Sequence, residues 1–323
     1  MKLVGHDSQI AAFRAAADSG RLHHAWLLTG PEGVGKASFA LQAATRLLAD
    51  AAGPRVHLPG FETPDDHPVA RYIRAGSHPD LRILARLTKD KSDDLARSIN
   101  IEQVRSLQGL FATTPSLSPR RVVIIDAIDD LERNGANALL KNLEEPPAGT
   151  VFLLISHAPG KLLPTIRSRC RLLRFGALSG DQMLLALQRL LPEEPRDEIE
   201  ALVAVGEGSP GRALGFAGLD IGTLDAAIDR LVGEGDPTNA IRSALAKQLG
   251  IKAAQARYEA YLDRVPARIA AEARGREGPA LANAIALWEE ARRVGESAVH
   301  LSLDPSTTVF ELATLLAKLA PDK

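Results

Sequence analysis

The segment from residue 30 to residue 36 has the residue types and the spacing that bind phosphate. It places Gly30, Gly33, Gly35 and Lys36 in a Gly-x4-Gly-Lys pattern, after an apolar run and before a stretch with helical periodicity. Glycines let backbone N–H groups curl around phosphate oxygens, the helix N-terminus adds its positive dipole end, and the lysine can reach the outer phosphates. A plain glycine turn with a solvated lysine is the alternative, but the strand before and the helix after favour a nucleotide loop.

Magnesium is poorly provided for in the same region. The motif has Ser or Thr after the lysine, where a hydroxyl binds Mg²⁺, but this chain has Ala37. Ser38 is one residue further on, rotated about 100° around the helix axis. Asp126 ends a second apolar run, at the place where nucleoside triphosphatases put a magnesium-orienting carboxylate. We therefore expect weak binding of ATP or ADP and little support for Mg²⁺.

Composition excludes several classes of protein. The net charge of −1 over 323 residues excludes gross electrostatic attraction to DNA. The longest stretch without a charged residue, 146–160, contains prolines and glycines, so we expect no membrane-spanning helix. The single cysteine, Cys170, excludes a disulfide framework and a cysteine-based zinc site within the chain. These features predict a soluble, cytoplasmic protein.

The apolar pattern predicts an α/β fold for the first half of the chain. Short apolar runs without alternation are typical of strands covered on both faces, and they alternate here with helical patterns, which indicates a parallel sheet. The runs are 25–28, 81–84, 122–125, 151–155 and 172–175. Residues 177–216 contain short helical patterns broken by proline and glycine, and residues 217–323 show Ala/Leu-rich helices without a convincing strand. We predict domains at 1–176, 177–216 and 217–323.

Longer stretches are typical of one protein family. They are Val4–Asp7, Gly20–Trp26, the phosphate loop, Asn137–Pro147 with its Leu-Leu-Lys-x-Leu-Glu-Glu-Pro-Pro run, Leu162–Cys170 ending in Ser-Arg-Cys, and Gly208–Ala213. Together they resemble the bacterial clamp-loader family of AAA+ ATPases, most closely its delta-prime type, over most of residues 5–215. The resemblance implies an AAA+ P-loop domain, a small helical lid domain and an all-α C-terminal collar domain.

The family resemblance also implies a function. Members of the delta-prime type belong to the DNA polymerase III complex, a DNA-directed DNA polymerase and nucleotidyltransferase, and help to load the sliding clamp during DNA replication. The implied partners are gamma/tau and delta subunits in a hetero-oligomeric ring, the sliding clamp, and primed DNA through the assembled complex. We expect little or no catalysis by this chain alone.

Site roles are carried over at matching positions only. Arg169, inside Ser168-Arg169-Cys170, corresponds to the family's arginine finger, which acts in trans on a neighbour's nucleotide. Ser156 matches a polar sensor position, although it could equally cap the turn toward Pro159. Arg212 lies near a second sensor position without aligning cleanly. Hydrolysing members have a glutamate after the strand-end aspartate, where this chain has Ala127.

Alternatives differ from this interpretation at identifiable residues. An active gamma/tau-type ATPase would need a hydroxyl after Lys36 and a glutamate after Asp126, and a small-molecule kinase would not explain Ser-Arg-Cys. Asp129 and Asp130 follow at a spacing that favours capping of the next turn over catalysis. Many relatives carry a four-cysteine zinc module after the first helix. Residues 50–79, at that place, have no cysteine and scattered histidines at 57, 67 and 78, so we expect no metal site and a surface insertion.

Overall fold

The computed structural model describes residues 3–88, 95–301 and 303–321. Contacts divide the chain into two compact units, Met1–Pro192 with Gly206–Ala213 and Glu193–Val205 with Leu214–Lys323. Residues 177–216, expected to form a lid domain, are shared between these units, and the three-domain division stays a prediction. No helix among the described residues is long and apolar enough to cross a membrane.

The first unit is built on a parallel sheet in the strand order β2-β3-β4-β1-β5. The strands are β1 (Ala25–Thr29), β2 (Leu81–Ala85), β3 (Arg121–Asp126), β4 (Thr150–Ser156) and β5 (Arg171–Arg174). Each apolar run singled out in the sequence becomes a strand, with ends within one residue of the run. The predicted α/β fold class with a parallel sheet is confirmed.

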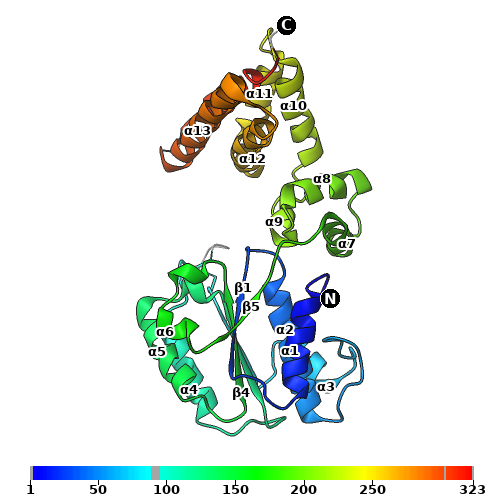
Figure 1. The fold of residues 1–323 in the computed structure, drawn as a ribbon, viewed down its shortest axis with the longest axis vertical. Helices are drawn as coiled ribbons and strands as arrows, with labels where there is room; N and C mark the ends of the chain where they lie inside the picture. Colours follow the sequence, from blue (N-terminus) through cyan, green and yellow to red (C-terminus); the bar gives the residue numbers. More distant parts are fainter. Residues whose placement is uncertain (1–2, 89–94, 302, 322–323) are drawn as a thin grey trace. The chain divides into compact units, whose positions relative to one another are not determined.

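Helices cover both faces of this sheet (Figure 1). On one face lie α1 (Asp7–Asp18), α2 (Lys36–Ala52) and α3 (Pro68–Arg74), and on the other α4 (Ile101–Phe111), α5 (Arg133–Glu144) and α6 (Pro164–Arg167). Side chains of β1 alternate between two hydrophobic clusters, with Trp26 packed beside Phe13 and Leu27 beside Leu139. Burial on both faces explains why the strand sequence is continuously apolar.

Local sequence signals account for some helix ends. Asn100 caps α4 by accepting a hydrogen bond from the Gln103 amide at 3.0 Å, and the Gln103 side chain accepts one from the Asn100 amide at 3.2 Å. This reciprocal capping box satisfies two amides that the helix itself leaves unpaired, and its Asn-x-x-Gln spacing is a helix-start signal within the sequence. The unit also contains α7 (Gly180–Leu190) and α9 (Pro210–Leu214), with short 3₁₀ turns at Ile128–Asp130 and Pro159–Lys161.

The second unit is helical throughout its described residues. It contains α8 (Arg196–Gly206, except for the last residue), α10 (Ile221–Glu234), α11 (Ala240–Leu249), α12 (Gln255–Ala273), α13 (Gly278–Leu301) and α14 (Pro305–Ala317). The buried faces of these helices consist mainly of Leu, Ile, Val and Ala. Ion pairs join α10 and its N-cap to α12, namely Asp220–Arg257, Asp225–Arg264 and Asp229–Arg268.

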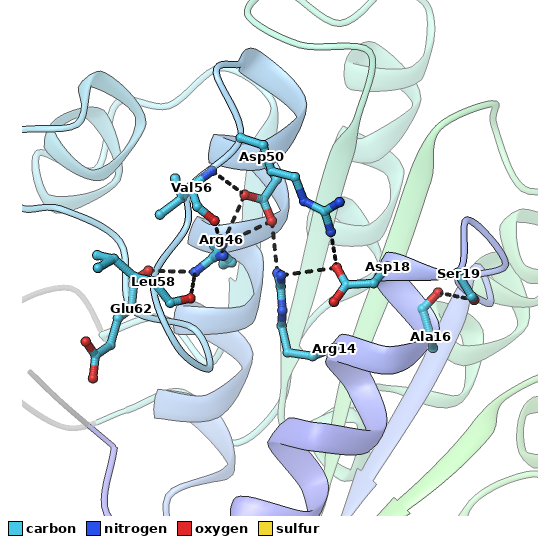
Figure 2. A network of polar contacts seen from close by, with 10 residues as sticks. Arg14, Ala16, Asp18, Ser19, Arg46, Asp50, Val56, Leu58 and Glu62 are labelled. Carbon is cyan, nitrogen blue, oxygen red and sulfur yellow. Dashed lines mark hydrogen bonds and ion pairs between the residues drawn. The ribbon is translucent and has the colours of Figure 1, made fainter.

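A buried arginine ties the segment after α2 to that helix (Figure 2). The side chain of Arg46 is 2% exposed. Its guanidinium donates to three backbone carbonyls, those of Val56, Leu58 and Glu62. Its Nε donates to the Asp50 carboxylate at 3.0 Å, and that carboxylate also accepts from Arg14 at 2.9 Å and from the Val56 amide at 3.0 Å. Burial would raise the pKa of Asp50, but these donors outweigh it and hold the pKa below its usual value.

The expectation that residues 50–79 form a surface insertion was wrong in part. The segment contains α3, and three of its apolar side chains, Val56, Phe61 and Val69, are buried in the cluster that includes α1 and α2. The Arg46 contacts supply donors for carbonyls of the irregular stretch beside this core. The segment is therefore part of the first unit's folded core.

Arg46→Ala is expected to lower the free energy of unfolding of the first unit by about 3 kcal/mol. The reason is that a largely buried carboxylate loses one donor and three backbone carbonyls lose theirs. Urea unfolding followed by Trp26 fluorescence in a Trp288→Phe background measures this unit. The matched control is Arg55→Ala, which removes an exposed pair with Asp18 and should change stability by less than about 1 kcal/mol. Equal effects of the two variants would contradict the structural role of Arg46.

The Asp50 carboxylate should stabilise the fold above about pH 4, because its folded-state pKa is lowered. This contribution to the free energy of unfolding should be lost as pH falls through that lowered pKa, and the same urea unfolding repeated at several pH values measures it.

Candidate nucleotide site and the Arg169 loop

The phosphate loop connects β1 to α2 at the carboxyl edge of the sheet. Gly33 has a φ of +74°, and Gly35, the N-cap of α2, has a φ of +107°. A Cβ at Gly33 would lie 2.9 Å from the Cα of Gly211, a backbone atom that cannot rotate away. Glycine is therefore required at residue 33 by both its backbone angle and its close neighbour.

The loop turns its carbonyls toward the protein. The Ser209 hydroxyl donates to the Glu32 carbonyl at 2.7 Å, and the Gly211 amide donates to the Gly33 carbonyl at 2.9 Å. The His6 ring lies with its Nε2 2.8 Å from the Val34 carbonyl. The amides of residues 33–35 have no hydrogen-bond acceptor within the described chain. Amides without an acceptor at a helix N-terminus match the chemistry of a phosphate group.

Lys36 is folded back onto the loop. Its Nζ donates to the Gly30 carbonyl at 2.7 Å and also to the Pro31 carbonyl, and the residue is 2% exposed. Burial lowers the pKa of Lys36 to about 8, against the opposing attraction of Asp126 and Glu32. The Lys36 ammonium therefore lies beside the amides of residues 33–35 and loses its proton more easily than an exposed lysine.

A cavity of about 770 Å³ opens beside the loop. Gly33, Gly35, Lys36 and Asp126 line it, so the structure brings these sequence-predicted residues together. Arg212 also lines the cavity, and its Nη1 lies 2.7 Å from a carboxylate oxygen of Glu207. Gly30 belongs to the same site through its carbonyl, which accepts from Lys36.

Asp126 is half-buried at the end of β3. Burial raises its pKa above the usual value, although His157 and Lys36 nearby favour the ionised form. Ala127, the next residue, is buried, so this position offers no side chain that could activate water. Ala37 lines the cavity where the motif has a hydroxyl. The residues present fit a phosphate chain better than they fit a magnesium ion.

The hydroxyl of Ser156, the residue at the polar sensor position, is bound inside the protein and does not line the cavity. The residue is fully buried, and its hydroxyl donates to Asp129 Oδ1 at 2.9 Å. Asp129 also accepts from the backbone amides of His157 at 2.6 Å and Ala158 at 3.3 Å. The Asp129 carboxylate therefore has a structural role. The sequence favoured capping of the turn that follows β3, but the carboxylate instead binds donors in the chain after β4.

His157 is a site residue that the sequence analysis did not identify. It lines the cavity, and its Nδ1 is buried without a hydrogen-bond partner among the described residues. Its position directly after an apolar strand was the available signal, because side chains at the carboxyl ends of parallel strands face the ligand site of such sheets.

Arg169 lies outside the cavity, in the turn between α6 and β5. Its Nη1 donates to the Thr165 carbonyl at 2.9 Å, and its Nη2 lies 2.7 Å from Glu144 Oε1. The side chain is 34% exposed. Burial raises the pKa of the following thiol, Cys170, to about 12, so this cysteine stays protonated at neutral pH.

Two of the three histidines at 57, 67 and 78 have structural contacts. His67 accepts from the Val69 amide at 3.2 Å at the start of α3, and His78 accepts from the Asp80 amide at 3.1 Å. Within the described ranges, no group of three or more histidine, cysteine, aspartate or glutamate residues could hold a metal ion.

A family model described as DNA polymerase III, delta subunit, matches residues 5–179, which is more than half of the chain. The chain belongs to this family. A DNA polymerase III subunit delta-prime from Pseudomonas aeruginosa is 38% identical over 58% of the chain and 53% of its own length. A DNA polymerase III subunit tau from Escherichia coli is 32% identical over 86% of the chain and 41% of its own length. The matches thus span about half the length of these curated relatives.

The resemblance to the delta-prime type of this polymerase III family is confirmed by the family model and the delta-prime relative. Among solved structures, a DNA polymerase III gamma subunit-related protein from Thermotoga maritima is similar with a TM-score of 0.44 at 15% identity, over 96% of this chain and 99% of that one.

The Lys36 ammonium is expected to titrate near pH 8, because burial disfavours its charged form. The measurement is an NMR titration of the lysine Cε resonances in ¹³C-labelled protein, with the Lys36 signal assigned by its loss in Lys36→Arg. The other lysine signals serve as internal controls and should titrate near the ordinary value of about 10.4. A Lys36 midpoint above about 10 would contradict the buried position of this side chain.

Proposed function

We propose that this chain is a delta-prime-type clamp-loader subunit that hydrolyses little or no ATP itself and supplies Arg169 to the active site of a neighbouring ATPase subunit. The observation that carries this proposal is that Arg169 lies apart from the chain's own phosphate-loop cavity. The chain's own cavity has a phosphate loop without hydrolytic groups, while Arg169 lies partly exposed outside that cavity. Its membership of the delta family supports the same assignment.

The cavity supports nucleotide binding more than nucleotide hydrolysis. The amides of residues 33–35 and the Lys36 ammonium would hold the phosphates of ATP or ADP, and His157 and Arg212 add donors on the cavity wall. A nucleotide bound there would supply negative charge that draws Lys36 away from the Gly30 carbonyl. With alanine at 37 and 127, this chain contributes neither the usual hydroxyl ligand for magnesium nor a general base after Asp126.

Arg169 has the chemistry of a group acting in trans. A guanidinium is permanently charged, and its planar fork of donors suits the phosphate oxygens on which charge develops during hydrolysis. The pair with Glu144 keeps the side chain at the surface, and the partner is itself 50% exposed. Such an exposed pair is weak, so the guanidinium can exchange Glu144 for phosphate at little cost.

The wider assembly follows from the same assignment. The proposed partners are gamma/tau and delta subunits in a hetero-oligomeric ring in the cytoplasm, acting with the sliding clamp and with primed DNA through the complete complex. Residues 217–323 would form the collar that joins the ring, because their described part is a set of packed helices with many apolar side chains and no catalytic constellation.

An active gamma/tau-type ATPase is the second candidate. The tau relative, similar over most of this chain, favours it, whereas Ala37 and Ala127 oppose it. The two candidates differ in one measurable property, which is ATP turnover by the chain alone.

The isolated chain is expected to show no steady-state ATP hydrolysis above background, with or without primed DNA, because it lacks a magnesium ligand and a general base. Phosphate release by purified protein measures this, and Lys36→Ala is the matched control for contaminating ATPases. Turnover in the wild-type chain that disappears in Lys36→Ala would reject the non-hydrolysing assignment and favour the gamma/tau alternative.

Arg169→Ala is expected to lower ATP hydrolysis and clamp loading by a complex reconstituted with gamma/tau-type and delta-type subunits of the same organism. The neighbouring site should lose a factor of about 10³ or more, while the other sites in the ring keep their own arginines. Arg169→Lys should restore little, since an ammonium lacks the planar fork. Lys161→Ala, a neutralisation of another exposed cation in the same basic run, is the control and should leave hydrolysis unchanged. Gel filtration should show normal assembly, and wild-type hydrolysis with Arg169→Ala would refute the finger.

A further inference from the structure

A notch lies on the surface of the first unit beside the edge strand β5. It has a volume of about 500 Å³; its floor includes Leu27, Thr29 and Leu172, and its rim includes Arg167, Ser168 and Arg174. We call this feature the basic notch. None of these six residues lines the cavity beside the phosphate loop.

Strand register explains how the floor and part of the rim come together. Leu27 pairs with Leu172 and Thr29 pairs with Arg174 across the parallel β1–β5 pair, so these four side chains lie on the same face of the sheet. The helix on this face near the sheet edge, α6, is only four residues long. Leu172 is consequently 45% exposed, although its strand neighbour Leu27 is only 2% exposed.

The arginines of the rim have no acidic partner. Residues 161–174 contain five basic side chains and no acidic one. Arg169 pairs with Glu144, and Arg171 lies over the Trp26 ring on the opposite face, 4.8 Å from its centre. Among the described residues, the side chains of Arg167, Arg174 and Lys161 form no ion pair or hydrogen bond. Two unpaired guanidiniums therefore flank one partly apolar floor.

We propose that the basic notch receives a segment of the neighbouring clamp-loader subunit that carries a carboxylate next to an aliphatic or aromatic side chain. Charge complementarity selects the carboxylate, because a guanidinium fork binds carboxylate oxygens in two parallel hydrogen bonds. The exposed leucine on the floor selects the apolar neighbour, since interfaces combine a buried apolar centre with a polar rim. The inference rests on the proposed function, because the neighbouring subunit is the one that receives Arg169.

The basic notch lies directly beside Arg169, so its occupant would affect the position of that side chain. Arg167 and Ser168 of the rim directly precede Arg169, and the turn is held by backbone hydrogen bonds from Arg169 to Ile166 at 3.1 Å and from Ser168 to Pro164 at 2.9 Å. A carboxylate seated between Arg167 and Arg174 would therefore fix the position of the finger. The notch would act as a positioning surface, without touching the reacting phosphate.

A nucleic-acid backbone is the competing occupant for a basic surface. It would bring phosphates to the arginines but no side chain to the leucine floor, and the whole chain is close to neutral. The observations favour the protein segment, and the experiment includes an arm that separates the two.

The test measures the affinity of the full-length chain for the gamma/tau-type subunit of the same organism by titration. The variants are the double replacement Arg167→Glu with Arg174→Glu, each of the two single replacements, and the floor variant Leu172→Ala. The control Lys161→Glu matches each single replacement, because it makes the same cation-to-anion change at one residue of the same run outside the notch. We expect the double variant to bind about tenfold or more weakly, Leu172→Ala about threefold more weakly, and the control within about twofold of wild type. Circular dichroism and Trp26 fluorescence verify that each variant is folded.

The outcomes separate this inference from the proposed function. Normal binding by the double variant, or equal weakening by Lys161→Glu, overturns the notch. Loss of primed-DNA binding by the assembled complex with unchanged subunit affinity also overturns it, in favour of a nucleic-acid site. If the notch fails while Arg169→Ala still lowers hydrolysis, the proposed function stands alone. No measurable affinity of the wild-type chain for the gamma/tau-type subunit would overturn both.

Discussion

The first unit depends on the way the loop after β1 satisfies its own carbonyls. Ser209 and the Gly211 amide bind the carbonyls of Glu32 and Gly33, and Lys36 binds that of Gly30. With the carbonyls occupied on the protein side, the amides of residues 33–35 are left for an anion. The same contact requires glycine at residues 33 and 211, because the two backbones approach closely. The exposure of the loop amides and the packing of α9 against the loop are therefore one structural feature.

Asp129 gives the neighbouring strand ends a similar fixed arrangement. By accepting from the Ser156 hydroxyl and from the amides of His157 and Ala158, it joins the chain after β3 to the chain after β4. This arrangement places His157 on the cavity wall and removes Ser156 from it. A carboxylate whose oxygens accept from three donors is not free to activate water. The carboxyl edge of the sheet thus combines free loop amides with an aspartate that is engaged by three donors, and it has alanine at residues 37 and 127.

The edge of the sheet at β5 presents a different kind of chemistry. Arg169 is held at the surface by Glu144, and the basic notch beside it exposes two arginines above a partly apolar floor. The notch arises because α6 is short and leaves part of the β1–β5 face open. In the proposed assembly, the cavity serves the chain's own nucleotide and the β5 edge serves a neighbour. Charge on an edge strand also discourages unwanted strand pairing, so the arginines suit a surface that must meet one partner only.

Much of this protein was determined by the sequence alone. Continuous apolar runs identified the strands, because strands buried on both faces need no polar alternation, and Asn100 with Gln103 identified a helix start. The phosphate loop and the family could also be predicted, since each depends on the residue types and spacing within short segments of the chain. Tertiary structure decided where long-range hydrogen bonds go. Ser156 binds an aspartate 27 residues away instead of facing the cavity, and Arg46 binds carbonyls of an irregular segment beside the core. Arg167 of α6 and Arg174 of β5 line one notch with residues of β1. The physical reason is that strand and cap preferences act between neighbouring residues, whereas the direction of a buried donor depends on which distant acceptor the fold brings beside it.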